Sequence, residues 1–248
     1  MNSSNHVNKH AIELSIVVPC FNEEKSIELV LERFKKAIKA SGVEVIMVDN
    51  GSIDASGQII KALLPKYPFA KSVTVKKNIG YGNGILEGLK VANGKYLGWT
   101  HADLQTDPQD VAKALKIIKQ ASRDDLFVKG WRKGRPIGDQ VFSAFMAIYV
   151  SFALGKMFKE VNAQPTIFSR KFYETFKNPP KDFSLDLYVY YLAKLSKQKI
   201  VRFNVLFPKR LHGQSSWNTS FRNRIKLTLR AMRYTKELKK ILHDIRRP

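Results

Sequence analysis

Cysteine, acidic residues and long apolar runs are all scarce in this sequence. Cys20 is the one cysteine in 248 residues, so no disulfide can form within the chain, which fits a reducing compartment. Residues 1–14 contain no apolar segment, and we therefore expect no signal peptide there. No apolar run reaches the roughly 18–20 residues that a membrane-spanning helix needs, so we expect no membrane span.

The scarcity of acidic residues leaves a strongly basic chain. Asp and Glu number 21 against 43 Lys and Arg, which gives a formal net charge of +22. Beyond Lys199 the acidic residues are Glu237 and Asp244. A lysine-rich genome would explain part of the lysine excess, but it explains less well the arginines near the C-terminus. The charge predicts an anionic partner, which can be nucleic acid, a phosphorylated substrate or an anionic lipid surface.

Strand-like and helix-like segments alternate through the first half of the chain. Apolar and β-branched runs predict strands at 14–21, 43–50, 71–77, 95–103 and 125–131. Apolar residues at helical spacing predict helices at 23–41, 54–64, 83–94 and 108–120. We expect Asp54 to cap the second helix and Gly94 to end the third. This alternation predicts an α/β fold with a mostly parallel sheet, whose ligands bind beyond the carboxyl ends of the strands.

The second half of the chain is organised differently. Residues 141–154 form an apolar run with serines as its only polar residues, and its length favours a buried or interfacial helix over a membrane span. A predicted helix at 182–198 and strand at 199–207 lead into a basic loop at 208–218. From Thr219 onward, apolar residues on one face and Lys or Arg on the other predict a basic amphipathic helix.

Four segments, in this order, resemble the family 2 glycosyltransferases, which have the GT-A fold. They are IVVPCFNEEKSI (16–27), VIMVDNGSIDAS (45–56), NIGYGNGILEGLKVANGKYL (78–97) and HADLQTDP (101–108). HADLQ and RLHGQS (210–215) are most similar to motifs of the family's polyprenyl-phosphate branch, which includes the dolichyl-phosphate mannose synthases. The resemblance implies a GT-A domain over 1–218, with a nucleotide-sugar half at 14–135, an acceptor and membrane-facing half at 136–218, and the basic tail at 219–248.

The resemblance places a nucleoside pocket after the first two predicted strands. Glu23 and Asp49 match residues that hold the nucleoside in the family, and carboxylates there can accept hydrogen bonds from base and ribose. Pro19 and Phe21 can form walls of the pocket, and Gly51 belongs to the same cluster. The alternative is that 49–52 is merely a turn, because Asp, Asn, Gly and Ser are favoured turn residues.

A glycine-rich turn precedes the third predicted helix. Gly80, Gly82 and Gly84 are of the kind that can cradle a phosphate at a helix N-terminus. A lone pattern of this type is weakly specific. In the family this segment mainly shapes the donor pocket, and we favour that role here.

HADLQ is the predicted catalytic centre. Asp103 and Gln105 match the family's second acid and its glutamine, so the resemblance implies that they bind Mg²⁺ or Mn²⁺ together with the donor diphosphate. His101 replaces the first acid, and imidazole is tolerable for Mn²⁺ but a poor ligand for Mg²⁺. Three interpretations stay open: Asp103, Gln105 and the diphosphate hold the metal alone, His101 contacts the nucleotide, or the metal is bound weakly. A fourth is a strand-end histidine without a site role.

Three further acidic positions lie near predicted helix starts. Asp107 precedes Pro108 and is expected to cap the next helix, and Asp182 and Asp186 lie at the start of the helix at 182–198. Asp186 is the best candidate for a general base toward a hydroxyl acceptor, whereas a phosphate acceptor is already ionised. An acid favoured by the helix dipole is the plain alternative for Asp186.

Basic residues complete the candidate site. Arg132 and Arg135 are similar to family arginines near the active site, with solvated surface charge as the alternative. In the loop at 208–218, Arg210 and Ser215, with Lys209, are implied to clasp the donor diphosphate or an acceptor phosphate. His212 and Trp217 of the same loop are less specific.

We predict an inverting hexosyltransferase that moves a sugar from a nucleotide-diphosphate donor to polyprenyl phosphate. The apolar run at 141–154 beside basic flanks predicts peripheral binding to an anionic membrane surface on the cytoplasmic face. A core or dimer helix is the alternative for that run, and a homo-oligomer stays open. Other functional hypotheses are transfer to a hydroxyl of a polysaccharide or lipid-linked glycan with Asp186 as base, and an inactive sugar-nucleotide or membrane-binding module. Nucleic-acid binding ranks last, because no recognised motif supports it.

Overall fold

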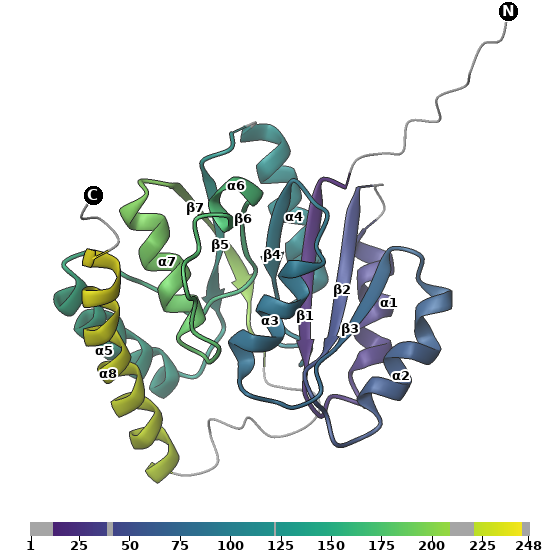
Figure 1. Cartoon of the computed structure of the whole chain (residues 1–248), viewed down its shortest axis with the longest axis horizontal. Helices are drawn as coiled ribbons and strands as arrows, with labels where there is room; N and C mark the ends of the chain where they lie inside the picture. The colour runs from purple at the N-terminus through teal and green to yellow at the C-terminus, as the bar shows by residue number, and fades with distance from the viewer. Residues whose placement is uncertain (1–11, 39–41, 122, 209–220, 245–248) are drawn as a thin grey trace, which may run out of the picture.

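The computed structural model describes residues 12–38, 42–121, 123–208 and 221–244, and Figure 1 shows its arrangement. A single sheet lies at its centre. Its strands are β1 (Leu14–Cys20), β2 (Val43–Asp49), β3 (Ala70–Thr74), β4 (Tyr96–Trp99), β5 (Leu126–Lys133), β6 (Thr166–Ser169) and β7 (Lys199–Leu206). The helices are α1 (Ile27–Ala37), α2 (Ser56–Leu63), the 3₁₀ turn η1 (Leu64–Lys66), α3 (Tyr81–Lys90), α4 (Pro108–Ala121), α5 (Ile137–Leu154), α6 (Arg170–Tyr173), α7 (Leu185–Leu195) and α8 (Phe221–Asp244).

The sheet is mostly parallel, as the sequence predicts. Its strand order is β3-β2-β1-β4-β6-β5-β7, and β6 alone among the described strands runs antiparallel to both of its neighbours. β1 is paired with β2 on one side and with β4 on the other. The chain therefore winds outward from β1 through β2 to β3 and then returns to add β4 on the opposite side. In α/β sheets this reversal of direction is where a ligand crevice opens, at the carboxyl ends of the strands.

Two apolar layers cover the sheet. One core cluster combines α3 and α7 with residues of β1, β2 and β4, including Leu89, Trp99 and Tyr188. The other combines α1, α2 and α4 with the opposite face, including Phe34, Ile60 and Leu115. Alternate residues of β1 point to opposite layers, because successive side chains of a strand face opposite sides. Burial on both faces explains why the central strands consist of continuous apolar runs.

Several predicted boundaries differ from the structure. β6 lies in 161–176, where we predicted no strand, because its four residues are too few to show a periodic pattern. α3 ends at Lys90 rather than at Gly94. Gly94 instead packs against Ser15, and a β-carbon there would lie 2.5 Å from the Ser15 backbone nitrogen. β4 ends at Trp99, so the HADLQ segment forms a loop beyond the strand.

α5 and α8 pack together at one side of the molecule (Figure 1). The Tyr149 hydroxyl donates to the Met232 carbonyl oxygen at 3.4 Å, and Leu238 of α8 is fully buried in the core. α5 begins four residues before the apolar run that we identified in the sequence. Among the described residues it is the one helix that is long and apolar enough to cross a membrane, which corrects our expectation of no such segment.

Candidate functional site

The loops that follow β1 and β2 are held together by hydrogen bonds. The Asn22 amide donates to Ser52 Oγ at 3.2 Å, and the Ile53 amide donates back to Asn22 Oδ1 at 3.0 Å. The Glu23 amide donates to Ser56 Oγ at 2.9 Å. Pro19, one residue before the end of β1, is half-buried, and Phe21 lies at the same edge with 45% of its surface exposed. The structure thus brings Pro19, Phe21, Glu23 and the 49–56 segment to one edge.

Asp49 lies at the end of β2 in a tight turn. Its Oδ1 accepts from the Ser52 amide at 3.0 Å, and Gly57 has no β-carbon, which allows the other carboxylate oxygen to approach α2. Gly51 has φ of +75° and packs on the backbone of 77–78, so it needs to be glycine. The turn interpretation is therefore correct for the backbone, and it leaves the role of the Asp49 carboxylate open.

Carboxylates gather around this turn. Burial raises the pKa of the Cys20 thiol, and the nearby charges of Glu23, Asp49 and Asp54 raise it further. A thiol in these surroundings is a poor nucleophile. Asp54 accepts from the Ser56 amide at 3.0 Å but lies one residue before the cap position, Ala55, so it is not the N-cap that we predicted.

The HADLQ loop is built around a buried carboxylate. Asp103 is 5% exposed, and its Oδ1 accepts from the Gln105 amide at 3.0 Å. Leu104 between them has φ of +61°, a conformation that bulky residues rarely adopt outside functional sites. Asp107 accepts from the Gln109 amide at 2.8 Å, which confirms its predicted role as the cap of α4.

The described residues contain no group of three His, Cys, Asp or Glu side chains that could hold a metal ion. Asp103 and Gln105 lie in one short turn, and the ring of His101 is 5.9 Å from that of Tyr81. A single carboxylate fits Mg²⁺ or Mn²⁺ when substrate phosphates and water supply the remaining ligands. The residues therefore fit a cation that arrives largely with its substrate, and they do not form a closed protein cage.

The glycine-rich turn serves close packing. A β-carbon on Gly82 would lie 2.6 Å from the Asp182 carbonyl oxygen, and Gly80 packs on the Lys181 backbone. The Asn83 amide donates to the Lys181 carbonyl oxygen at 2.8 Å. The turn therefore joins α3 to the segment before α7, and this contact explains the glycines at 80 and 82 without a bound phosphate.

Arg132 and Arg135 share one carboxylate. Arg132 Nε is 2.6 Å from Glu160 Oε2, and Arg135 Nη1 is 3.3 Å from Glu160 Oε1. Their side chains are only 11% and 9% exposed, so the interpretation as solvated surface charge is wrong. One carboxylate is thus shared by two guanidinium groups at the end of β5, with Asp139 as a further acidic neighbour of Arg135.

Asp186 is buried beside three donors from other elements. Its Oδ1 accepts from Gln164 Nε2 at 2.8 Å and from Trp99 Nε1 at 3.3 Å, and Lys129 Nζ lies 3.9 Å away. We missed Gln164 and Lys129 in the sequence. Lys129 did carry a signal, because it is a charged residue within an otherwise apolar strand, FVKGW.

Other predicted site residues lie outside the described part of the chain: Lys209, Arg210, His212, Ser215 and Trp217. The described chain reaches Pro208, whose carbonyl oxygen accepts from Gln105 Nε2 at 3.0 Å. The HADLQ loop is thus joined to the residue just before the predicted phosphate-binding loop.

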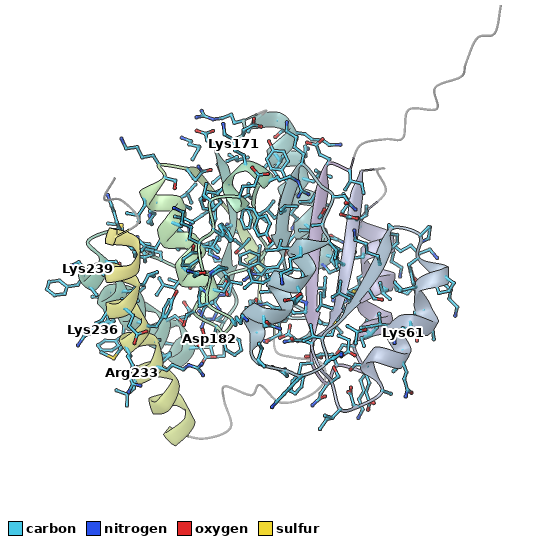
Figure 2. The ribbon with its side chains drawn as sticks, viewed as in Figure 1. Lys61, Lys171, Asp182, Arg233, Lys236 and Lys239 are labelled. Atoms are coloured by element: carbon cyan, nitrogen blue, oxygen red, sulfur yellow. The ribbon has the colours of Figure 1, made fainter. Side chains whose placement is uncertain are left out.

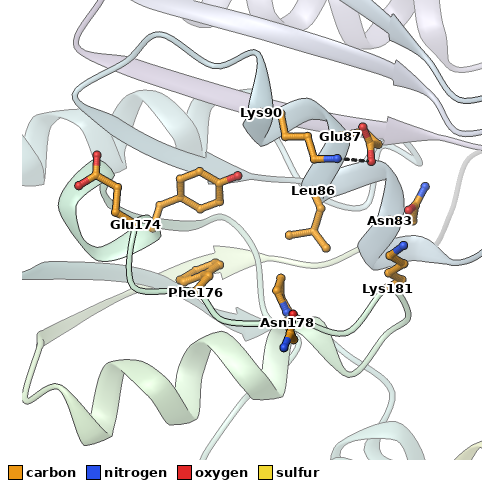
Figure 3. A pocket seen from close by; sticks show the side chains of 10 residues that line it. Asn83, Leu86, Glu87, Lys90, Glu174, Phe176, Asn178 and Lys181 are labelled. Carbon is orange, nitrogen blue, oxygen red and sulfur yellow. Dashed lines mark hydrogen bonds and ion pairs between the residues drawn. The ribbon is translucent and has the colours of Figure 1, made fainter. Parts of the chain in front are cut away.

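A separate cavity of about 480 Å³ lies between α3 and residues 173–181, and none of the predicted site residues lines it. Figure 3 shows its polar side chains, with the Glu87–Lys90 ion pair at 2.7 Å on α3. The lining residues are Asn83, Leu86, Glu87, Lys90, Tyr173, Glu174, Phe176, Asn178, Pro179 and Lys181.

The sheet order and the strand-end loops define a GT-A glycosyltransferase fold. Glucosyl-3-phosphoglycerate synthase from Mycobacterium tuberculosis, solved with Mn²⁺, UDP-glucose and phosphoglyceric acid, superposes with a TM-score of 0.68 over 90% of this chain and 78% of that one. The sequence identity is 18%, so this similarity concerns the fold alone. The chain belongs to the glycosyl transferase family 2, whose family model matches residues 15–160.

Several curated relatives are named as polyprenyl-phosphate sugar transferases. The chain is 33% identical over 131 residues to dodecaprenyl-phosphate galacturonate synthase of Rhizobium johnstonii, and 29% identical over 111 residues to dolichol-phosphate mannosyltransferase of Pyrococcus furiosus. These matches cover 52% and 45% of this chain but only 38% and 31% of the two relatives.

Proposed function

We propose that this protein transfers a sugar from a nucleotide-diphosphate donor to polyprenyl phosphate. The observation that carries the proposal is the convergence of the predicted donor residues at one sheet edge, where β1, β2 and β4 end beside the reversal in strand order. The names of the curated relatives, which include dodecaprenyl-phosphate and dolichol-phosphate transferases, support the acceptor class.

Glu23 and Asp49 bind the nucleoside in this proposal, and Asp103 with Gln105 faces the diphosphate. A divalent cation would be held by Asp103 and the donor, with Gln105 beside them, and it would neutralise charge on the departing diphosphate. The Mn²⁺ and UDP-glucose bound by the mycobacterial neighbour support this arrangement. Arg132 and Arg135 add positive charge at the same end of the sheet, and Arg210 and Ser215 complete the phosphate contacts.

The acceptor reaches the site from a membrane surface in this proposal. Apolar side chains recur along one exposed face of α5, with exposed fractions of 60% for Phe145 and 69% for Ile148, and this face also includes Val141 and Phe152. Exposure on this scale supports a surface helix over a core helix, and the alternative of a dimer helix stays open. Arg233, Lys236 and Lys239 lie along the adjacent α8 (Figure 2), where they would attract anionic headgroups.

Transfer proceeds by in-line displacement at the anomeric carbon. An oxygen of the acceptor phosphate forms the new bond to that carbon as the bond to the donor diphosphate breaks, and the electron pair leaves on the nucleoside diphosphate. The acceptor phosphate is already ionised, so no proton has to be removed. The anomeric configuration is inverted because attack and departure occur on opposite faces.

A donor screen followed by a transfer assay tests the proposal. Thermal shift with UDP-, GDP- and dTDP-sugars, with and without Mn²⁺, should show stabilisation by one nucleotide, and more with metal. That donor should then release nucleoside diphosphate only when a polyprenyl phosphate is added in detergent or vesicles. If no nucleotide raises the melting temperature, or if the donor binds without any transfer, the proposal is refuted, and the second result would favour an inactive binding module.

A further inference from the structure

A lysine lies fully buried in the middle of the sheet. The side chain of Lys129, in β5, has no exposed surface, and its Nζ donates to the Ala163 carbonyl oxygen at 2.9 Å and to Thr166 Oγ1 at 2.7 Å. Its third neighbour is Asp186, at 3.9 Å. Removing a lysine from water is costly, and the two hydrogen bonds to neutral oxygens and the carboxylate at 3.9 Å offset only part of that cost.

The contacts of Asp186 all fall on one of its two oxygens. Oδ1 accepts from Trp99 of β4 and from Gln164, which precedes β6, and it is also the atom nearest to Lys129 of β5. Three elements of the sheet therefore fix a carboxylate that α7 supplies. None of these contacts involves Oδ2.

This cluster, consisting of Asp186, Lys129, Gln164 and Trp99, adjoins the HADLQ loop. Trp99 ends β4 two residues before His101. The ring of Tyr81 stacks on Phe183 with centroids 4.9 Å apart and also lies beside His101. Burial raises the pKa of the Tyr81 hydroxyl, and the charges of Asp186 and Asp103 raise it further, so both carboxylates act on one buried group.

The contacts fix the orientation of the Asp186 carboxylate. Donors from β4 and from the residue at 164 converge on Oδ1, with the Lys129 ammonium nearest to the same atom. A carboxylate that is held through one oxygen directs its other oxygen one way, which suits a hydrogen bond to a hydroxyl at a set position.

We propose that Lys129, Gln164 and Trp99 are positioning residues that hold Asp186 through Oδ1, so that Oδ2 accepts a hydrogen bond from a hydroxyl of the transferred sugar. Asp186 then orients the sugar and removes no proton. This inference rests on the proposed function and deepens it, because an enzyme without a base at this point requires an acceptor that is ionised beforehand. It argues against transfer to a neutral hydroxyl with Asp186 as base.

Single and double variants test this inference in the full-length protein. In Lys129→Met and Trp99→Phe, kcat for transfer to polyprenyl phosphate should fall by about tenfold, while the KM for the donor and the nucleotide-induced thermal shift stay near those of the unaltered protein. The double variant Lys129→Met/Asp186→Asn should lose no more activity than the less active of its two single variants, because both changes disrupt the same interaction. Lys116→Met, on the exposed face of α4, is the matched control and should leave kcat unchanged.

The pH dependence of stability shows whether Lys129 is buried in the folded protein as the structure has it. Burial lowers the pKa of Lys129 to about 7 from 10.5, and Arg202 and Arg132 lower it while Asp186 and Glu160 oppose the change. The unfolded chain then binds more protons above that pH, so the free energy of unfolding should rise between about pH 7 and 10.5. In Lys129→Met this rise should be smaller.

The outcomes separate the inference from the proposed function. If the unaltered protein does not transfer sugar, the proposed function fails, and this inference fails with it. If transfer occurs and the folded Lys129→Met and Trp99→Phe variants retain full kcat, the inference alone is refuted. A loss of about 10²–10⁴-fold in Asp186→Asn alone, at unchanged KM, would identify a general base and would also overturn the inference.

Discussion

The donor side of the molecule, which is formed by the loops after β1 and β2, differs from the side formed by α5 and α8. The donor side pairs its polar groups in hydrogen bonds, whereas the other side exposes apolar side chains. On the donor side, backbone amides after β1 and β2 are bonded to Ser52, Ser56 and Asp49, so each loop fixes the next. On the other side, α5 exposes an apolar face, and Phe152 is 90% exposed. The first pattern indicates a site prepared for a small polar ligand. The second indicates a surface whose partner is itself apolar.

The largest effect is expected from the carboxylate in the HADLQ loop. Asp103→Asn should reduce transfer by about 10²–10³-fold, because in the proposed mechanism it removes the charge that faces the departing diphosphate and its cation. Steady-state release of nucleoside diphosphate measures the loss, and circular dichroism checks the fold. Asp107→Asn is the matched control, because asparagine also caps a helix, and it should retain activity. Equal losses in the two variants would show that Asp103 only supports the loop.

The next effect concerns the apolar face of α5. Phe145→Glu/Ile148→Glu should abolish sedimentation with vesicles that contain anionic lipid, and transfer to polyprenyl phosphate in those vesicles should fall by about tenfold or more. The donor-induced thermal shift should not change, since Phe145 and Ile148 are exposed, whereas α5 contacts Arg135 through Ser143.

Leu29→Glu is the control for each single α5 substitution, because it places one negative charge on an exposed apolar position of α1. Vesicle binding that survives the α5 changes would separate this helix from the membrane and would favour the alternative of a protein interface.

The smallest effect is expected at His101, and it concerns the donor side only. His101→Asp should tighten Mn²⁺ and Mg²⁺ binding in the presence of nucleotide by about tenfold, since a second carboxylate is a better ligand for these cations than imidazole. The metal affinity is measured by following the thermal shift in the presence of nucleotide as the metal is titrated. Vesicle binding should be unchanged. An unaltered metal affinity would place His101 outside the metal's reach.

Sequence patterns predicted the sheet because its central strands are buried on both faces, and burial demands apolar runs of recognisable length. The same logic placed Glu23, Asp49 and Asp103 at one edge, since parallel strands end together. The sequence could not place Gln164 and Lys129 against Asp186, because they belong to separate elements that the fold brings together. It also predicted no strand at the position of β6. It did not decide whether the helix at 141–154 is buried in the core or lies on the surface, since an apolar helix has the same composition in either place.

The direction of β6 has a consequence for how the choice of sugar can differ between relatives. A strand that runs against its neighbours begins where they finish, so the connection that leads into β6, residues 155–165, arrives at the ligand edge of the sheet. A connection into a parallel strand would arrive at the opposite edge. Changes in length or sequence within 155–165 are therefore expected to alter which sugar is accepted while the sheet itself stays intact. Exchanging this segment between relatives would transplant donor preference.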